Sequence, residues 1–78
     1  MVLLESHIRI LREVAEKGEE GIPISEIVPK REYRDFVIGF LERQGLIRVR
    51  RQGGGGRAFI TKKGLKVLRA RARKKVVT

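Results

Sequence analysis

Residues 45–64 read GLIRVRRQGGGGRAFITKKG, and this stretch decides the fold. After Gly45, the segment LIRVRR alternates apolar residues with arginines, which is the period of a half-buried strand. Four consecutive glycines follow, and the segment RAFI resumes an extended pattern with Ala58 and Ile60 on one face. Glycine accepts positive φ and fits the tip of a hairpin. The stretch therefore predicts a β-hairpin with a glycine tip.

A glycine-rich segment can also cradle phosphate, which is the alternative to a hairpin tip. A phosphate loop ends in Gly-Lys-Ser/Thr and leads into a helix whose N-terminus meets the phosphates. Here the glycines lead into RAFI, which has a strand pattern, and no helix is predicted before Thr61. This context excludes a nucleotide-binding loop. Two interpretations of the tip stay open: it contacts a polyanion beside its flanking arginines, or it is merely permissive and contacts nothing.

The charge distribution points to a polyanionic partner. Residues 1–45 carry seven Lys/Arg and nine Asp/Glu, whereas residues 46–78 carry twelve Lys/Arg and no acid. The two parts have net charges of −2 and +12, which give the total of +10. Mixed charges keep a surface soluble equally well, so solubility does not require this separation. A one-sided basic field is typical of proteins that bind nucleic acid.

Composition excludes several function classes. The 78 residues contain no cysteine and one histidine, so disulfides, thiolate metal sites and a histidine pair are ruled out. We therefore predict no enzyme activity, no cofactor, no metal and no small-molecule effector. No apolar run reaches the length of a membrane span, and the first residues lack a signal-peptide pattern, which predicts a cytoplasmic, nucleoid-associated protein. The absence of Asn and the high charge are typical of thermophile proteins and favour an archaeal source.

Two strong helices are predicted before the hairpin. Residues 2–17 have apolar residues at helical spacing, with His7 as a half-buried structural residue in the stripe and Gly18 as the stop. A second helix is predicted from residue 30 or 31 to 44, ended by Gly45 in a left-handed conformation. Its expected inward stripe consists of Tyr33, Phe36, Val37, Phe40 and Leu41.

Shorter elements are predicted on either side of that helix. Residues 17–23 read as a loop, and Ser25 is the expected N-cap of a very short helix that ends before Pro29. After the hairpin, Thr61 is the expected cap of a final helix over residues 61–75, with a frayed end at 76–78. The chain is predicted to form a single domain, residues 1–78, of the α+β class and mainly helical.

The order of these elements carries a family resemblance. The segments ISEIV, FVIGFLERQGLIRVRR and GRAFITKKG resemble winged helix-turn-helix domains over residues 22–70. In these domains a Gly-Leu-Ile turn leads from a helix into a β-hairpin wing, and a Thr-x-x-Gly segment opens a final helix. The chain is similar to small stand-alone archaeal regulators, including those that dimerise through a long C-terminal helix. The resemblance implies a recognition helix over residues 30–44 that binds DNA.

Candidate contact residues follow from the expected outward faces. On the recognition helix, the N-terminal cations suit phosphate or guanine, and Asp35 suits cytosine N4. Gly39, also predicted to face outward, permits close approach of a backbone, although chance explains it equally well. The candidates on the recognition helix are Lys30, Arg31, Arg34, Asp35 and Ile38. Those on the wing are Arg48, Arg50, Arg51, Gln52, Gly53, Gly54, Gly55, Gly56 and Arg57, and those on the final helix are Lys62 and Lys63.

The final helix admits two interpretations. Leu65, Leu68, Ala72 and Val76 have the spacing of a coiled-coil-like seam, which predicts a homodimer. Alternatively, the cationic end is a tail that contacts phosphates without sequence specificity.

The sequence therefore predicts a double-stranded DNA-binding protein, a transcriptional regulator in the first place. Two alternatives keep the fold: an RNA-binding winged helix, and a non-specific chromatin protein. A protein–protein adaptor is a further alternative from another class.

Overall fold

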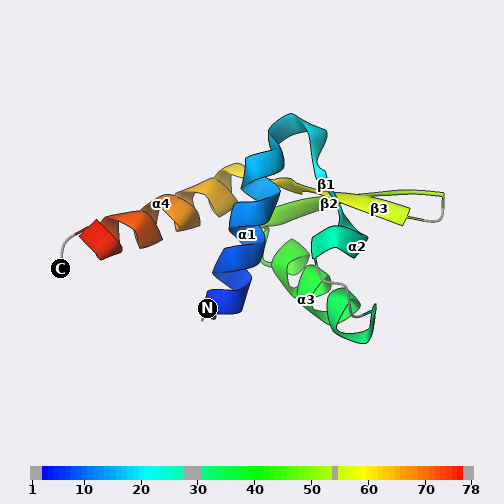
Figure 1. Ribbon diagram of the computed structural model, residues 1–78, viewed down its shortest axis with the longest axis horizontal. Helices are drawn as coiled ribbons and strands as arrows, with labels where there is room; N and C mark the ends of the chain where they lie inside the picture. Colours follow the sequence, from blue (N-terminus) through cyan, green and yellow to red (C-terminus); the bar gives the residue numbers. More distant parts are fainter. Residues whose placement is uncertain (1–2, 28–30, 54, 77–78) are drawn as a thin grey trace.

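A computed structural model describes residues 3–27, 31–53 and 55–76. The helices are α1 (Glu5–Lys17), the 3-10 turn η1 (Gly18–Glu20), α2 (Ile24–Ile27), α3 (Arg31–Arg43) and α4 (Lys62–Val76), and the strands are β1 (Ile22–Pro23), β2 (Ile47–Gln52) and β3 (Gly55–Ile60). The first three α-helices pack against the sheet, while α4 leads away from the hairpin (Figure 1). The hairpin tip and the far end of α4 therefore lie at opposite ends of a molecule that is 45 Å long.

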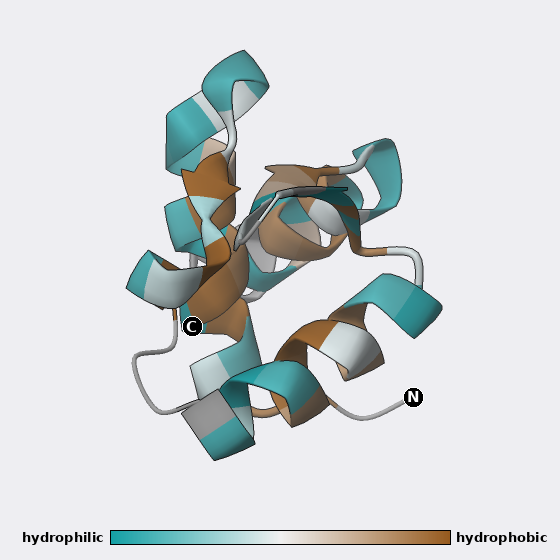
Figure 2. Ribbon diagram, turned by 90° about the vertical axis from the view of Figure 1, so that its right-hand side faces the viewer, coloured by the Kyte–Doolittle hydropathy of each residue, from teal (hydrophilic) through white to brown (hydrophobic). Residues whose placement is uncertain are grey.

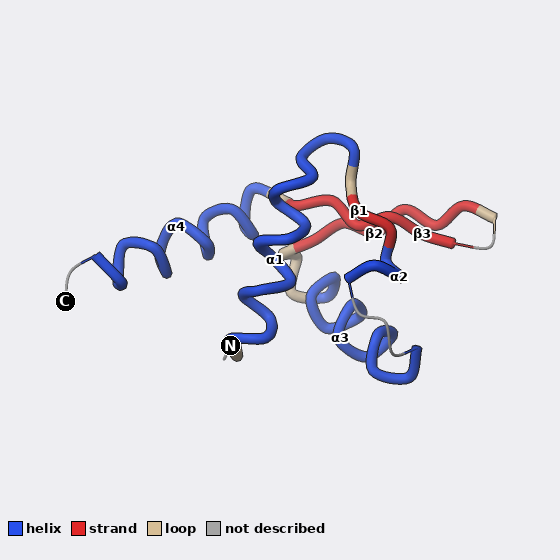
Figure 3. Tube along the Cα trace, viewed as in Figure 1, coloured by secondary structure: helices blue, strands red, loops and turns tan. Residues whose placement is uncertain are grey.

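The sheet has three antiparallel strands in the order β1-β3-β2 (Figure 3). In β1, Ile22 pairs with Ala58 and Pro23 with Arg57. The prediction of a loop over residues 17–23 was wrong at these two positions. Proline is compatible with strand pairing here because β1 is an edge strand, where one side needs no ladder hydrogen bond. The strand is too short to show an alternating pattern in the sequence.

The short helix before Pro29 starts two residues earlier than predicted. Since α2 spans Ile24–Ile27, Ser25 lies within the helix, and its prediction as the N-cap was wrong. Ile24 and Ile27 are both buried, so burial of these two side chains fixes this single turn against the core. Pro29 and Lys30 lie outside the described residues.

The hydrophobic core lies between the helices and the sheet, where Figure 2 shows the apolar residues gathered. The helix α1 begins at Glu5, later than predicted, and its buried residues Ile8, Ile10, Leu11 and Val14 confirm the apolar stripe, whereas Leu4 is 58% exposed. Gly18 ends the helix with φ of 56°. His7 is half-buried, as predicted: its Nδ1 accepts the Leu4 N–H at 3.1 Å, and its ring stacks on Phe40 at 5.0 Å between centroids. The buried members of the core are Ile8, Ile10, Leu11, Val14, Ile22, Ile24, Ile27, Val37, Ile38, Leu41, Leu46, Ile47 and Ala58.

The orientation of α3 about its axis differs from the prediction. Ile38, expected on the DNA-facing side, is 2% exposed and lies in the core. Tyr33 and Phe36, expected inside, are 51% and 72% exposed. The aliphatic side chains of Val37, Ile38 and Leu41 let α3 lie close to α2 and β2, and the rings of Tyr33 and Phe36 remain outside. Ile38 is therefore a core residue and not a DNA contact.

One threonine joins α3, the hairpin and α4. Gly45 has φ of 75°, as predicted for a left-handed residue ending α3. The Thr61 hydroxyl donates to the Gly45 carbonyl at 2.7 Å and accepts the Gly64 N–H at 3.0 Å. Thr61 is thus the predicted cap of α4. The helix continues through Val76, which was expected to belong to the frayed end, and residues 77–78 lie outside the described residues.

Candidate nucleic-acid interface

The turn at the hairpin tip is shorter than the sequence predicts. Gln52 pairs with Gly55 and Arg51 with Gly56, so only residues 53 and 54 separate β2 from β3. Two of the four glycines are strand residues, which corrects the prediction of a four-glycine tip. Gly53 has φ of 56°, a conformation that favours glycine in a tight hairpin turn. Gly54 lies outside the described residues.

The glycines of the hairpin have different roles. A Cβ on Gly56 would lie 3.0 Å from Ile24 Cδ1 and 3.2 Å from the Arg50 carbonyl oxygen, so α2 requires a small residue here. Around Gly53 and Gly55, by contrast, no atom lies within 4 Å of the position a Cβ would take. Gly56 therefore lets the hairpin pack against α2, whereas Gly53 and Gly55 leave the tip open to a partner.

The register divides the hairpin arginines between two faces. Arg48 pairs with Phe59 and Arg50 with Arg57, and these pairs share the face that points away from the core. Arg51 pairs with Gly56 on the opposite face. We call the face formed by Arg48, Arg50, Arg57 and Phe59 the arginine face.

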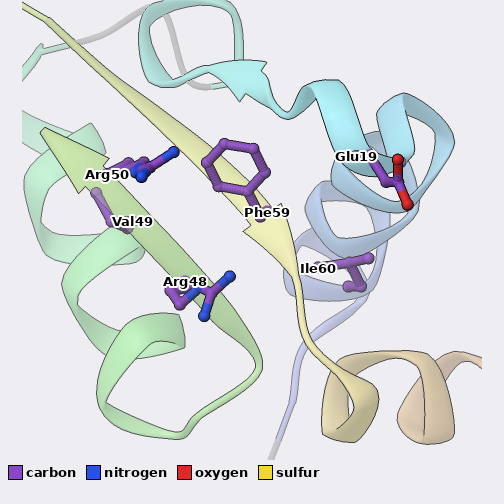
Figure 4. Close-up of a pocket in the computed structure, with 7 residues that line it drawn as sticks. Glu19, Arg48, Val49, Arg50, Phe59 and Ile60 are labelled. Carbon is purple, nitrogen blue, oxygen red and sulfur yellow. The ribbon is translucent and has the colours of Figure 1, made fainter. Parts of the chain in front are cut away.

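The arginine face offers cations at the protein surface. Arg48 and Arg50 are exposed, and neither makes an ion pair in the described part of the chain. Two hollows in this surface share Glu19, Arg50 and Phe59 in their linings. Figure 4 shows one of them, with Phe59 between Arg50 of β2 and Glu19 of η1. Phe59 is half-buried, because its ring packs beneath Gly21, where a Cβ would lie 2.5 Å from Cε2. Phe59 therefore supports the loop above it.

Arg57 has a structural role that the sequence did not indicate. Its Nη1 donates to the carbonyl oxygens of Glu20 and Gly21, at 3.3 and 3.4 Å. These hydrogen bonds hold the loop between η1 and β1 against β3. Arg57 is nevertheless exposed, so its contact with phosphate remains a prediction. One nitrogen of its guanidinium group already donates hydrogen bonds within the chain.

This difference gives a prediction about stability. Arg57→Ala should lower the free energy of unfolding by about 1 kcal/mol, because the two carbonyls lose a charged donor at a partly exposed site. That change corresponds to roughly 4–8 °C in Tm for a domain of this size. Arg50→Ala, a matched change on the same face, should stay within about 0.5 kcal/mol. Thermal unfolding of both variants measures this. Equal Tm values would show that the Arg57 hydrogen bonds do not stabilise the loop.

The exposed face of α3 carries more acidic residues than the single one, Asp35, that was predicted as a contact. Asp35 is exposed, and Glu32 and Glu42 are exposed beside it. Arg34 is half-buried. Of the other predicted contacts, Lys30 and the Arg31 side chain lie outside the described residues, and Ile38 is in the core. Carboxylates repel phosphate, so α3 is a weaker polyanion surface than the hairpin.

Two solved structures resemble the chain. The AF1382 protein of Archaeoglobus fulgidus superposes with a TM-score of 0.77 at 17% identity, over 97% of this chain and 90% of that one. The PcaV transcriptional regulator of Streptomyces coelicolor, solved with its natural ligand, superposes with a TM-score of 0.75 at 22% identity. This alignment covers 86% of the present chain and 51% of PcaV, so the chain spans about half the length of that regulator.

With the element order and the β2-β3 hairpin, these likenesses confirm the predicted fold. The chain has a winged helix-turn-helix fold. No protein-family model matches the sequence, and no curated protein sequence matches it either. The hairpin is the wing of this fold, and α3 occupies the position of its recognition helix.

The final helix of the winged helix begins at the base of the wing. Lys62 and Lys63 are exposed in the first turn of α4, far from the wing tip. Of the predicted dimer seam, Leu68 packs against the core of its own chain and Leu65 is half-buried. The side chains of Ala72 and Val76, like that of Gln52 in the wing, lie outside the described residues. Arg71 forms an ion pair with Glu5, which fastens α4 to α1.

The described residues contain neither a metal-binding cluster nor a membrane-spanning helix. Among residues 3–27, 31–53 and 55–76, no group of three His, Cys, Asp or Glu side chains is placed to hold a metal ion. Within the same residues, no helix has both the length and the apolar character needed to cross a membrane.

Proposed function

We propose that the chain binds double-stranded DNA as a transcriptional regulator and that the wing supplies most of the affinity. The observation that carries this proposal is the exposed position of the Arg48 and Arg50 guanidinium groups on one face of the wing, where neither forms an ion pair with another described residue. Guanidinium forks match phosphate oxygens in geometry as well as in charge. A regulatory, non-enzymatic role also agrees with the likeness to PcaV.

The tip of the wing is suited to lie along a phosphate backbone. Gly53 and Gly55 present backbone without side chains, so N–H groups at the tip can approach phosphate oxygens closely. Arg51 lies on the opposite face of the wing from Arg48 and Arg50. A wing that enters a groove therefore presents cations toward both of its walls.

The rest of the basic half extends the proposed contact surface. Residues 46–78 contain no acid, so neither the wing nor α4 repels phosphate. Lys62 and Lys63 are proposed phosphate contacts at the base of the wing, and Lys30, Arg31 and Arg34 are proposed contacts at the start of α3. Phosphate contacts position a protein without reading sequence. Asp35 is the proposed base reader, as an acceptor for cytosine N4.

Removing the cations of Arg48 and Arg50 tests the proposal. The double variant Arg48→Ala/Arg50→Ala should bind duplex DNA at least about tenfold more weakly, because two charge-assisted phosphate contacts are lost. Arg12→Ala, on the exposed side of α1, is the control for loss of charge away from the wing. Fluorescence anisotropy with a labelled duplex measures both. Equal affinities for the double variant and the wild type would refute the assignment of the wing as the contact surface.

RNA remains the second candidate ligand, and one observation bears on it. Single-stranded RNA is bound largely by stacking on exposed aromatic rings, and Tyr33 and Phe36 are exposed. Glu32 and Asp35 lie beside these rings, however, and repel the phosphates that accompany every base. Competition of the labelled duplex with double-stranded and single-stranded RNA distinguishes the ligands. DNA preference is expected, and stronger displacement by either RNA would favour the RNA-binding function.

Specificity can be tested separately from affinity. Selection of bound sequences from a random duplex pool should enrich a defined site if the chain is a regulator. Enrichment of no site would indicate a chromatin protein that recognises only the backbone, and absence of any nucleic-acid binding at physiological salt would indicate a protein–protein adaptor.

A further inference from the structure

Four residues form the outermost line of α3. Glu32, Phe36, Gly39 and Arg43 follow the i, i+4, i+7, i+11 spacing of one helix face, opposite the buried Val37, Ile38 and Leu41. Glu32 and Arg43 are exposed, and Phe36 is 72% exposed. A large ring, a helix position without a side chain and two opposite charges therefore lie in a row on the surface. The proposed DNA contacts account for none of these four residues.

This line is complementary to itself when it is reversed. If two copies of α3 pack antiparallel about a twofold axis between Phe36 and Gly39, each Phe36 faces the partner's Gly39. The same axis places each Glu32 opposite the partner's Arg43. In a twofold contact every interaction occurs twice, so one helix face supplies two aromatic insertions and two ion pairs. Matching of shape and matching of charge are satisfied by one register.

Gly39 gives this register a place for the ring. Glycine in the middle of a helix is unfavourable compared with alanine, so a contact that needs its lack of a side chain explains its presence. The nearest atom to a Cβ at this position is Nη1 of Arg43, at 3.3 Å. The Arg43 side chain is long and exposed, so it can turn from Gly39 toward the partner's Glu32 when the ring of Phe36 approaches.

We propose that the chain forms a twofold dimer through α3, with Phe36 packed on the partner's Gly39 and Glu32 paired with the partner's Arg43. Further exposed apolar groups surround the line. Tyr33 is 51% exposed, and Leu4, which is 58% exposed, lies at the end of α1 that the His7–Phe40 stack joins to α3. The dimer buries the ring of Phe36, which a monomer would otherwise leave in water.

A second copy fits this face better than the other possible occupants. The exposed carboxylates of Glu32 and Glu42 repel the phosphates of nucleic acid. The predicted seam along α4 would bring together two helices that each carry eight cations over residues 62–75 and no acid, which repel one another. While two copies are paired through α3, neither can place α3 in a major groove. Self-association and major-groove insertion of α3 are therefore mutually exclusive.

A charge exchange tests the dimer with the full chain. Glu32→Arg and Arg43→Glu, each alone, place like charges opposite one another at both ion pairs, so each variant should self-associate about tenfold or more weakly than the wild type. In an equimolar mixture of the two variants, every such pair is again of opposite charge. The mixture should therefore form dimers that neither variant forms alone. Sedimentation equilibrium measures this, with circular dichroism to show that each variant is folded.

Gly39→Ala provides a second readout that a purely structural residue would not give. In the monomer it should raise Tm by up to about 4–8 °C, because alanine favours the helix. In the dimer its methyl group occupies the position of the partner's ring, so self-association should weaken. The proposal is overturned if the wild type is monomeric at every concentration, if the single variants dimerise as well as the wild type, or if the mixture stays monomeric. The second result would place the contact elsewhere, the α4 seam included.

Discussion

Replacement of Gly64 by alanine is expected to destabilise the protein on the order of 3 kcal/mol, the upper part of the range for forcing an atom into packed surroundings. A Cβ at this position would collide with the carbonyl oxygen of Leu46 and would lie 2.7 Å from Ile60 Cδ1. The carbonyl belongs to the backbone and cannot turn aside. The first turn of α4 would have to move away from β2, which would strain the hydrogen bonds of Thr61. Thermal unfolding should show a decrease in Tm of roughly 10–20 °C.

The same substitution at another helical glycine controls for propensity. Gly39→Ala also adds one methyl group within a helix, but among the described side chains the atom nearest to that methyl group is Nη1 at the far end of Arg43. It should stabilise the monomer, so the two variants should change Tm in opposite directions. If Gly64→Ala also raises Tm, the close approach of α4 to β2 is not a feature of the folded protein.

The affinity of the wild-type protein for duplex DNA should fall by about a thousandfold or more between about 50 and 200 mM salt. This size of effect requires six or more phosphate contacts, each releasing counterions from the duplex. The basic half offers eight exposed cations among the described residues: Arg48, Arg50, Arg51, Arg57, Lys62, Lys63, Lys66 and Arg69. Anisotropy titrations at several salt concentrations measure the dependence.

The anion used in those titrations must be held constant, and a neutral osmolyte at matched osmolality controls for general effects of solute. An affinity that is flat over this range is incompatible with binding dominated by phosphate neutralisation. It would transfer the weight of recognition from the wing to α3 and its base contacts.

Sequence patterns that depend on neighbouring residues predicted the fold well. The alternation in LIRVRR, the left-handed glycine at residue 45 and the cap at Thr61 depend on local backbone chemistry, and all three are confirmed. The half-buried position of His7 was likewise evident from its place in an apolar stripe. These features need no knowledge of distant parts of the chain.

Features that depend on distant contacts were not predictable. The predicted orientation of α3 about its axis was wrong because its sequence contains two overlapping apolar stripes. Packing against α2 and β2 buries the aliphatic stripe that includes Ile38. The two-residue strand β1 exists only through its pairing with β3. In the site, the sequence did not distinguish Arg57 from the other wing arginines. Its hydrogen-bond acceptors, Gly21 and Glu20, lie 36 and 37 positions earlier in the chain.

The separation of charge along the sequence becomes a division of surfaces in the fold. The acid-free half forms the wing and α4, while the exposed face of α3 combines carboxylates with aromatic rings. This division supports our proposal that the two surfaces have different partners. The wing is proposed to bind a polyanion, and α3 is proposed to contact either DNA or, in the dimer, a second copy of the chain, but not both at once.

The central claim, that the arginine face of the wing contacts DNA phosphates, is tested most directly by the salt dependence of a wing variant. The measurement is the slope of the logarithm of duplex affinity against the logarithm of salt concentration, for the wild type and for Arg48→Ala/Arg50→Ala. Each lost phosphate contact should reduce the magnitude of the slope by about 1, so the account predicts a decrease of about 2. An unchanged slope would contradict it.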